Sequence, residues 1–367
     1  MSEPRRFAIL GTRGIPANYG GFETFAEELS TRLAERGHEV TVYCRTREGG
    51  AEYRGVKRRW APAVRHKYLE TLSHTFFSTI DLLFHRVDAA LYCNAANAVF
   101  TLAPRISGIP VALNVDGLER ERKKWNVLGK TWYHVSERMA AWFPCAVVSD
   151  ARVIQEYYRA TYHKDSVFIP YGATVERASG RGTLDALGLE PCRYFLYVSR
   201  MEPENNALHV RESFEQVDGA VKLALIGDAP YAKDYIERVR ATSDKRVVIP
   251  GAIYGQGYAE LQSHCLAYVH ETEVGGTHPA LIEAMGRGAL VLYLRTPENE
   301  EVAGGVGLGF ERRELAERMG QVLEMSEAER AAWGERAAAR VREHYSWDAV
   351  TGEYETLLCG LAGRKKR

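Results

Sequence analysis

A short stretch around residue 275 combines residue types that can hold a phosphate-bearing ligand. Residues 265–269 are apolar and predict a strand, Gly275, Gly276 and Thr277 form a turn of small residues, and Pro279 marks the start of a helix. The first backbone N–H groups of a helix have no partner inside the helix, and the helix dipole favours negative charge there. Glycines let a ligand approach the main chain closely. The stretch therefore predicts an anion site at a strand-to-helix turn.

Glu283 lies about one turn inside this predicted helix. At that place its carboxylate could accept hydrogen bonds from sugar hydroxyls next to a bound phosphate. The alternative is an ion pair with Arg287, four residues later, on a solvated helix face. The spacing alone leaves both interpretations open.

Arg200 is a second candidate for binding phosphate. It directly follows residues 194–198, an apolar run that predicts another strand. A guanidinium can hold a phosphate through two parallel hydrogen bonds. The alternative is a surface ion pair with Glu202 or Glu204.

The elements that must position these residues alternate between strand and helix. Residues 6–10 and 40–44 predict strands with an amphipathic helix at 22–36 between them, and the alternation begins again at residue 194. The pattern predicts an α/β protein with two Rossmann-like, doubly wound parallel sheets.

The domain boundary is predicted in the segment 173–191, which is rich in glycine and polar residues. We therefore expect an N-terminal, acceptor-side domain over residues 1–173 and a C-terminal, nucleotide-sugar-binding domain over residues 174–345. Residues 346–367 predict a final helix with the basic tail GRKKR, which we expect to be solvated.

A further helix is predicted over residues 68–87, because apolar side chains recur there on one stripe. The stripe consists of Leu69, Leu72, Phe76, Phe77, Ile80, Leu83 and Phe84. We interpret His74 in the same segment as packing on this helix and not as a catalytic residue.

The composition is that of a soluble globular protein, with 46% hydrophobic and 26% charged residues. No apolar run approaches the ~18 residues of a membrane span, and the N-terminus lacks a signal-peptide pattern. We therefore expect a cytoplasmic protein. The six cysteines lack metal-binding spacing, so neither disulfides nor a zinc site is expected.

The formal charge is zero but unevenly divided. Residues 1–177 contain 25 Lys+Arg and 19 Asp+Glu, and the remainder contains 23 and 29. The basic residues of the first half cluster at 54–67 and 120–125, with aromatic residues beside them. Such a surface could face an anionic bilayer or a phosphate-bearing acceptor, or it could be a solvated charged face. Nucleic acid is not expected as a partner, because no known reader motif accompanies the charge.

The first predicted strand–helix–strand unit argues against NAD binding. Its loop lacks the G-x-G-x-x-G pattern, and its second strand ends at Arg45, where an acidic residue would hold the ribose. Gly20 and Gly21 instead precede the helix directly. They either serve a ligand or only permit a tight turn. Asp116, in the loop after residues 111–114, could orient an acceptor hydroxyl or cap the next turn.

The sequence VGGTHPALIEAMGRG, residues 274–288, resembles the nucleotide-sugar signature of the family-four retaining glycosyltransferases. It is most similar to a bacterial subgroup of polysaccharide-building enzymes that includes rhamnosyltransferases, and the resemblance covers nearly the whole chain. The resemblance implies the GT-B fold. In that fold two Rossmann-like domains face each other across a cleft, and a C-terminal helix crosses back to the first domain.

The resemblance also implies roles for the residues around the turn. In this family a glutamate, seven residues and a second glutamate frame the donor. Glu283 matches the second glutamate, which holds the ribose. Gly275 occupies the place of the first glutamate, which contacts the transferred sugar; this is a departure from the family pattern. Glu273, two residues earlier, is the nearest candidate to replace it.

Arg200 matches a family arginine that binds the donor diphosphate. The lysine that usually follows it is replaced by Asn205 and Asn206, in a Pro-Glu-Asn-Asn form typical of the subgroup. The resemblance places Tyr254 beside the nucleotide base.

In the first domain, the resemblance places Gly20 and Gly21 across the cleft from the donor diphosphate. Asp116 occupies the position of a residue, often a histidine, that contacts the transferred sugar or the acceptor.

Together these features predict an enzyme that moves a sugar, with rhamnose as one candidate, from a nucleoside diphosphate to a glycan or lipid-linked glycan. Configuration would be retained, and the product would serve bacterial surface polysaccharide synthesis in the cytoplasm or at the inner membrane surface. The nucleotide-sugar is a substrate, so no cofactor is expected. No DxD-like cluster is present for Mg²⁺, so metal-independent activity is expected.

Two other functions remain open from the sequence. One is a sugar-nucleotide epimerase of the same fold, which would act without an acceptor. The other is a non-catalytic scaffold that binds nucleotide-sugar, a reading supported by the missing first glutamate and the missing lysine. An NAD oxidoreductase is the least favoured, because of the loop features described above.

Overall fold

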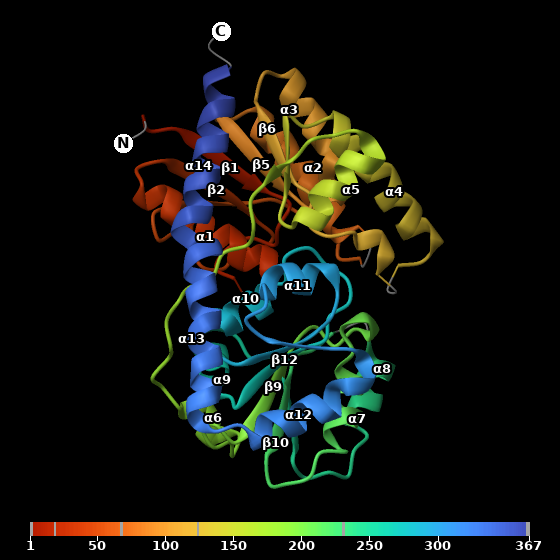
Figure 1. Ribbon diagram of the computed structural model, residues 1–367. Helices are drawn as coiled ribbons and strands as arrows, with labels where there is room; N and C mark the ends of the chain where they lie inside the picture. Colours follow the sequence, from red (N-terminus) through yellow and green to blue (C-terminus); the bar gives the residue numbers. More distant parts are fainter. Residues whose placement is uncertain (1–2, 18–19, 67–68, 123–124, 230–231, 365–367) are drawn as a thin grey trace. The chain divides into compact units, whose positions relative to one another are not determined.

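The computed structural model describes residues 3–17, 20–66, 69–122, 125–229 and 232–364, which form two compact units (Figure 1). Of these described residues, those within 1–121, 125–171 and 347–367 form the first unit, and Arg122 and those within 172–346 form the second. The final helix therefore belongs with the first half of the chain.

The first unit contains an eight-stranded sheet in the order β3-β4-β2-β1-β5-β6-β7-β8. Only the pairing of β3 with β4 is antiparallel among these strands. The strands are β1 (Arg6–Leu10), β2 (Glu39–Cys44), β3 (Glu52–Tyr53), β4 (Val56–Trp60), β5 (Ala89–Cys93), β6 (Val111–Asn114), β7 (Ala146–Ser149) and β8 (Val167–Phe168). The central strands are nearly continuous apolar runs, as expected where helices cover both faces.

Helices flank this sheet. They are α1 (Gly21–Glu35), α2 (Glu70–Leu83), η1 (Ala95–Thr101), α3 (Leu102–Ile106), η2 (Glu119–Glu121), α4 (Val127–Trp142), α5 (Arg152–Tyr162) and α14 (Trp347–Arg364). The last of these, α14, lies along α1 (Figure 1). Tyr354 of α14 is fully buried, its ring contacts Phe25 at 5.2 Å, and its hydroxyl accepts a hydrogen bond from Asn114 at 2.8 Å. These contacts confirm the prediction that the C-terminal helix returns to the first domain.

The second unit contains a six-stranded, all-parallel sheet in the order β11-β10-β9-β12-β13-β14. The strands are β9 (Tyr194–Val198), β10 (Lys222–Ile226), β11 (Val247–Gly251), β12 (Ala267–His270), β13 (Val291–Leu294) and β14 (Leu308–Phe310). The helices are α6 (Gly182–Ala186), η3 (Pro203–Asn205), α7 (Ala207–Phe214), α8 (Lys233–Arg240), α9 (Gly255–His264), α10 (Pro279–Gly286), α11 (Pro297–Ala303), η4 (Arg312–Glu314), α12 (Leu315–Glu324) and α13 (Glu327–His344). The structure confirms two Rossmann-like parallel sheets and the GT-B fold.

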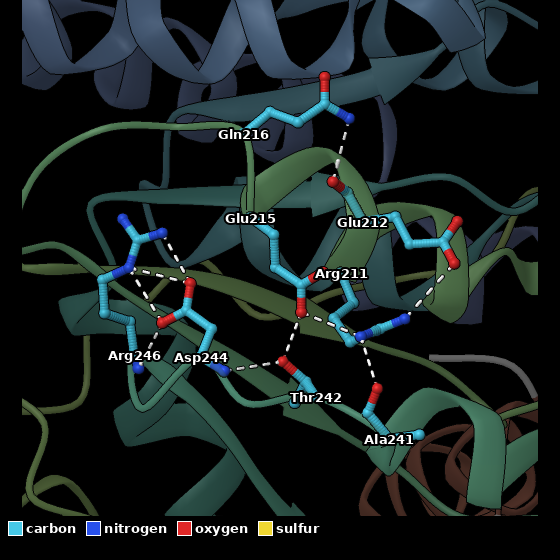
Figure 2. Close-up of polar contacts among 8 residues, drawn as sticks. All are labelled: Arg211, Glu212, Glu215, Gln216, Ala241, Thr242, Asp244 and Arg246. Atoms are coloured by element: carbon cyan, nitrogen blue, oxygen red, sulfur yellow. Dashed lines mark hydrogen bonds and ion pairs between the residues drawn. The ribbon is translucent and has the colours of Figure 1, made fainter.

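A polar network connects the segments at the amino edge of the second sheet (Figure 2). The guanidinium of Arg246 forms an ion pair with Asp244 at 2.7 Å and donates to the carbonyl of Val217 at 2.6 Å. It also lies over the ring of Phe214, 4.8 Å from the centroid. The network joins the end of α7 to the starts of β10 and β11, at the edge opposite to the ligand-binding edge of such sheets.

The two basic stretches of the first half are largely engaged in contacts. In residues 54–67 the structure contains β4, which the sequence analysis missed because its apolar alternation is interrupted by basic residues. Arg58 of β4 is buried and donates to the carbonyls of Ile15 and Gly50 at 2.7 and 2.6 Å. Arg59 forms an ion pair with Asp81.

The second stretch, residues 120–125, is engaged in a similar way where it is described. Arg120 lies 3.5 Å from the Glu137 carboxylate and over the ring of Tyr157. Lys123 and Lys124 lie outside the described residues, as do the last three residues of the basic tail.

The helix predicted over residues 68–87 is present as α2, but its apolar stripe points outward. Phe76, Ile80 and Phe84 are 46%, 41% and 81% exposed. The prediction of a helix was correct, but the helix is shorter than predicted, Glu70–Leu83, and its apolar stripe faces solvent, unlike that of an ordinary amphipathic helix. Within the described residues, no helix has the length and apolar character needed to cross a bilayer.

Candidate functional site

The strand order of the second sheet reverses between β9 and β12. β9 pairs with β10 on one side and with β12 on the other, so the chain proceeds outward from this point in both directions. Open α/β sheets bind ligands at the carboxyl ends of the strands beside such a reversal. Arg200 follows β9 and residues 271–278 follow β12, so the strand order brings together the two stretches that the sequence indicated.

Arg200 is partly exposed at the start of the loop after β9. Its side chain is 36% exposed, and its Nη2 lies 3.9 Å from the carboxylate of Glu202. This is the ion pair that the sequence left open as an alternative. A long, solvent-accessible pair of this kind contributes at most about 1 kcal/mol. The guanidinium is therefore not committed to Glu202 and can still bind a phosphate.

Asn205 and Asn206 organise the same loop. The Nδ2 of Asn205 donates to the carbonyl of Arg200 at 2.6 Å. Asn206 has a left-handed backbone, with φ at 62°, and its Nδ2 donates to the carbonyl of Glu271 at 2.9 Å. Asn205 therefore closes the loop after β9, and Asn206 connects that loop to the loop after β12. The Asn206 amide also accepts a hydrogen bond from Arg312 at 3.2 Å, which a lysine ammonium could not do.

Glu273 is held by this network. Its Oε1 accepts a hydrogen bond from Asn206 at 3.1 Å and forms an ion pair with Arg312 of η4. Its side chain is 25% exposed. The carboxylate is therefore fixed in orientation and compensated in charge, while its remaining lone pairs can accept from a ligand hydroxyl.

A second carboxylate, Glu271, lies on the other side of Arg312. Glu271 is fully buried, and its Oε1 is 2.7 Å from Nδ1 of His209 and 3.7 Å from Nε of Arg312. Burial raises the pKa of Glu271, and the hydrogen bond with His209 opposes that shift. Arg312 therefore links the two carboxylates that follow β12.

Gly275 is required by its neighbour in the turn. A Cβ added at this position would lie 2.5 Å from Cε1 of His278, whose side chain is itself buried. The ring of His278 in turn contacts that of His270, with the centroids 4.9 Å apart. The position that the resemblance assigns to the first family glutamate is therefore closed to a side chain in this arrangement.

Both histidines beside the turn are neutral at ordinary pH. Burial lowers the pKa of His278 to about 3, and it lowers the pKa of His270 well below its usual value. Neither ring can carry positive charge to a bound anion near neutral pH. The positive field on this side of the sheet must come from arginine and from the helix end.

The start of α10 supplies that helix end. His278 is the N-cap and Pro279 the first residue, and His278 makes no side-chain capping hydrogen bond to the helix. Helix N-termini attract anions, but Pro279 has no N–H and the N–H of Leu281 donates to the carbonyl of His278 at 3.1 Å, so α10 acts on an anion mainly through its dipole. The turn of Gly275, Gly276 and Thr277 leads directly into this helix end.

Glu283 points from α10 toward α9. Its Oε2 accepts a hydrogen bond from the hydroxyl of Tyr258 at 2.8 Å, and Gln262 donates to the same hydroxyl at 2.8 Å. Arg287, the alternative partner considered from the sequence, donates to the carbonyl of Glu176 at 2.6 Å. Tyr254 is the N-cap of α9, one turn before Tyr258, and is 53% exposed. Glu283 and Tyr254 therefore flank the first turn of α9.

In the first unit, the candidate residues also follow strands at the carboxyl edge of the sheet. Gly20 is the N-cap of α1, and its carbonyl accepts from the N–H groups of Glu23 and Thr24 at 3.1 and 3.2 Å. Gly21 begins the helix, and its carbonyl accepts from the hydroxyl of Tyr171 at 3.2 Å. A Cβ at Gly20 would make only an ordinary contact, at 3.5 Å from Glu23, so packing does not explain this glycine.

Asp116 lies just after β6 and adopts a left-handed backbone, with φ at 60°. Its N–H donates to Oδ1 of Asn114 at 3.0 Å. The side chain that closes this turn is thus that of Asn114. Contact of Asp116 with an acceptor stays a prediction.

Sequence reasoning missed Glu271, Arg312, His209 and Asn299. Glu271 directly follows β12 and Arg312 follows β14 by two residues, so their position after strands was an available signal. Asn299 of α11 is fully buried and donates to the carbonyl of Thr272 at 3.2 Å, which fixes the loop after β12. For His209 and Asn299 the sequence offered no signal, because each acts through a contact with a distant loop.

The site in the second unit suits a ligand with an anionic part and a hydroxyl-rich part. Arg200 and the start of α10 can bind the anion, while Glu273 and Glu283 can accept hydrogen bonds from hydroxyls. Carboxylates that are already oriented by Arg312 and Tyr258 lose little conformational freedom on binding.

Two family models match the chain. Residues 19–177 match Glycosyltransferase Family 4, and residues 192–325 match Glycosyl transferases group 1. A comparison with curated protein sequences finds no match.

Solved structures with the same fold match almost the whole chain at low sequence identity. Sucrose-phosphate synthase from Thermosynechococcus elongatus is 17% identical with a TM-score of 0.81, covering 98% of this chain and 100% of its own. HepE of Anabaena, in complex with UDP and glucose, is 16% identical with a TM-score of 0.78, covering 97% and 100%. An α,α-trehalose-phosphate synthase (UDP-forming) from Burkholderia vietnamiensis is 12% identical with a TM-score of 0.73, covering 98% of each chain.

Proposed function

The chain belongs to the family-four glycosyltransferases, which depend on nucleotide-sugars, and from this premise we propose that it transfers a sugar from a nucleoside diphosphate to a hydroxyl of a glycan or lipid-linked glycan. One observation supports the proposal most directly. Arg200 follows β9, the glycine turn and the start of α10 follow β12, and the strand order of the second sheet reverses between these two strands. This is the place where such sheets bind nucleotides.

In the proposed reaction, the bond between the sugar anomeric carbon and the diphosphate oxygen breaks, and a bond from that carbon to the acceptor oxygen forms. The acceptor proton passes to the departing diphosphate on the same face of the sugar, so configuration is retained. Arg200 and the amide groups near Gly275 stabilise the negative charge that develops on the diphosphate. The protein contributes positioning and electrostatics, and no protein nucleophile is needed.

The remaining site residues have proposed roles as well. Glu283 binds the ribose, Glu273 binds the transferred sugar in place of the absent first glutamate, and Tyr254 contacts the base. Asn205 and Asn206 hold the diphosphate loop. In the first unit, Asp116 and the pair Gly20 and Gly21 are proposed to serve the acceptor and the donor.

The identity of the transferred sugar is a separate proposal. The sequence resemblance points to rhamnose, whereas the structure of HepE from Anabaena contains UDP and glucose. The same resemblance supports a role in bacterial surface polysaccharide synthesis, with an acceptor carried on a lipid diphosphate. We also propose that no divalent metal is needed, since no DxD-like cluster occurs in the sequence.

A non-catalytic scaffold is the second candidate function. One observation favours it: Glu273 forms an ion pair with Arg312. Sugar transfer requires that the Glu273 carboxylate still contacts the sugar while this ion pair is present. An epimerase is not favoured by any contact described above.

A donor panel followed by a transfer assay tests the proposal. The full chain is melted with dTDP-rhamnose, UDP-glucose, other UDP-sugars and GDP-sugars, and a cognate donor at about 100 times its Kd should stabilise the fold by about 2.7 kcal/mol. With that donor, Arg200→Ala and Glu283→Ala should each lower kcat/KM by about a hundredfold or more, with EDTA having no effect. Arg193→Ala, at the exposed amino end of β9, is the matched control and should leave the rate unchanged.

The outcomes separate the candidate functions. Released nucleotide together with a glycosylated acceptor supports transfer. An isomerised donor formed without acceptor indicates the epimerase, and tight binding without turnover indicates the scaffold. Near-normal rates in both site variants would overturn the site assignment.

A further inference from the structure

Helix α2 exposes its apolar stripe to solvent, unlike an ordinary surface helix. Its buried side carries one large apolar side chain, Leu82, together with the polar residues His74, Thr75, Ser78 and Thr79. Phe76 and Phe77 on its outer side are 46% and 39% exposed. A helix on the surface of a water-soluble domain normally buries its apolar stripe and exposes its polar one. Large exposed apolar surfaces of this kind mark interaction sites.

The exposed apolar surface continues from α2 onto α3 and the end of α4. The ring of Phe76 contacts that of Phe100 in η1, with centroids 6.2 Å apart, so α2 lies beside η1 and the adjoining α3. Arg105 of α3 donates to the carbonyl of Trp142 at 2.8 Å, which joins α3 to α4. Ile106 and Trp142 are 76% and 73% exposed.

We name this surface the apolar face and define it by six exposed side chains on these three helices and at the C-cap of α2. They are Phe76, Phe77, Ile80, Phe84, Ile106 and Trp142. At the other end of α4, Val127 and Leu128 are 79% and 78% exposed, so α4 presents apolar side chains to solvent at both ends.

The exposed charged residues of α3, of α4 and of the segment directly after α2 are basic. They are Arg105 on α3, Lys130 and Arg138 on α4, and His85 and Arg86 after α2.

The carboxylates of α2 and α4 are engaged within the unit. Asp81 pairs with Arg59, Glu70 lies 3.5 Å from Arg45, and Glu137 is buried and accepts from tyrosine hydroxyls. α3 contains no acidic residue.

We propose that the apolar face docks the protein onto an anionic lipid bilayer, with Phe84, Ile106 and Trp142 in the headgroup region. Apolar side chains that enter the acyl boundary and basic side chains that face anionic headgroups bind a membrane surface together. An aromatic residue with a polar ring edge, such as Trp142, suits the interface. The inference is argued from this surface alone and does not depend on the transfer reaction.

Charge decides between a bilayer and a second copy of the chain. A two-fold dimer built on this face would place the same patch against itself and bring Lys130, Arg138 and Arg86 toward their own counterparts. Like charges across an interface are unfavourable, whereas anionic headgroups complement them. The face therefore fits a lipid surface better than a copy of itself.

Vesicle co-sedimentation of the full chain tests the proposal. The protein should bind vesicles of phosphatidylcholine with phosphatidylglycerol, bind phosphatidylcholine alone much less, and lose binding as salt is raised. The double variant Phe84→Ser, Ile106→Ser should bind about a hundredfold more weakly. Each substitution removes one apolar side chain that enters the bilayer and contributes about tenfold to the affinity. Val167→Ser, which removes an apolar side chain of 41% exposure on β8, is the matched control and should bind like the wild type.

A charge variant separates the electrostatic contribution to vesicle binding from the apolar one. Lys130→Glu, Arg138→Glu should abolish the preference for anionic vesicles, and Lys245→Glu in the second unit should not. Binding to anionic vesicles that is unchanged in both double variants would overturn the proposal. A wild-type dimer that the apolar double variant converts to a monomer, without vesicle binding by either, would assign the face to a second copy. All variants should retain the wild-type melting temperature, because every substituted side chain is exposed.

Discussion

At the residue scale, the turn after β12 depends on the absence of a side chain at one position. Gly275 lies against the ring of His278, and that ring is buried against His270. The glycine therefore lets the main chain approach the imidazole closely. The same contact explains why the first glutamate of the family pattern has no room at this place.

Gly275→Ala should destabilise the second unit by about 1–3 kcal/mol, because its Cβ would overlap a buried ring that cannot move freely. The donor KM should rise as the turn is displaced. Urea unfolding and a donor titration measure the two effects. Gly320→Ala, in α12, is the control: its Cβ would meet nothing within 4 Å, so stability should be kept or slightly increased. A Gly275→Ala protein with wild-type stability and donor affinity would show that the turn has room.

Arg312 shows how one residue can decide the charge of a site. It lies between the carboxylates of Glu271 and Glu273 and also donates to Asn206 at 3.2 Å. Without this guanidinium, two neighbouring carboxylates would repel each other and an incoming diphosphate. We interpret Arg312 as compensating for the positive charge that the absent lysine supplies elsewhere in the family.

At the element scale, one edge of the second sheet has a proposed role in ligand binding and the other has a role in stability. The carboxyl edge carries the candidate site, while the amino edge is held by the network around Arg246 (Figure 2). Arg246 contacts the carboxylate of Asp244 and the carbonyls of Val217 and Gly219 at 2.6 and 3.0 Å, so it joins the segments that precede β10 and β11.

Arg246→Ala should lower the free energy of unfolding by about 1–3 kcal/mol, because it leaves partly buried carbonyls and a carboxylate without their donor. Transfer activity per folded molecule should not change, since the network lies at the other edge of the sheet. Urea unfolding of the variant measures the loss. The exposed neighbour Lys245→Ala serves as control and should unfold like the wild type. Equal stability of the two variants would contradict a structural role for the network.

At the scale of the whole molecule, buried histidines make stability depend on pH in both units. Burial lowers the pKa of His74 in the first unit to about 4 and that of His278 in the second to about 3. In the unfolded chain a histidine titrates near 6.5. Between these values the unfolded state binds more protons than the folded state, so stability rises with pH and falls on acidification. Burial raises the pKa of Glu23 and Glu271, whose contribution has the opposite sign, being greatest at low pH and lost as pH rises.

The protein should therefore lose stability from about pH 6.5 down toward pH 4, by up to about 1.4 kcal/mol per pH unit for each buried histidine. His74→Leu removes one of these contributions and should flatten the decline, as followed by urea unfolding at a series of pH values. His344→Leu, at a histidine with 48% side-chain exposure, is the control and should decline like the wild type. A His74→Leu curve parallel to the wild type would show that this ring is not the source.

The fold and the centre of the candidate site could be predicted from local signals. The strands β1 and β9 have the predicted bounds, because continuous apolar runs ended by polar residues and glycine determine a buried parallel strand locally. The turn before Pro279 was recognisable for the same reason: small residues and a helix-starting proline act on their own backbone.

Other features were decided by contacts between segments far apart in the chain. Arg312 and Asn299 reach the loop after β12 only because β13 and β14 stack beside β12 in the sheet. In the basic stretch 54–67, the side chain of Arg58 is buried because β4 pairs with β2, which no local pattern of that stretch indicated.

Helix α2 separates the two kinds of information most clearly. The sequence by itself determined that Phe76, Ile80 and Phe84 share one side of a helix, because the 3.6-residue repeat is a property of the local backbone. Which side is covered depends on what packs against the helix, and here η1 and the sheet cover the side with His74 and Thr75. Periodicity groups side chains onto a face, but only tertiary packing decides whether that face meets the core or the solvent.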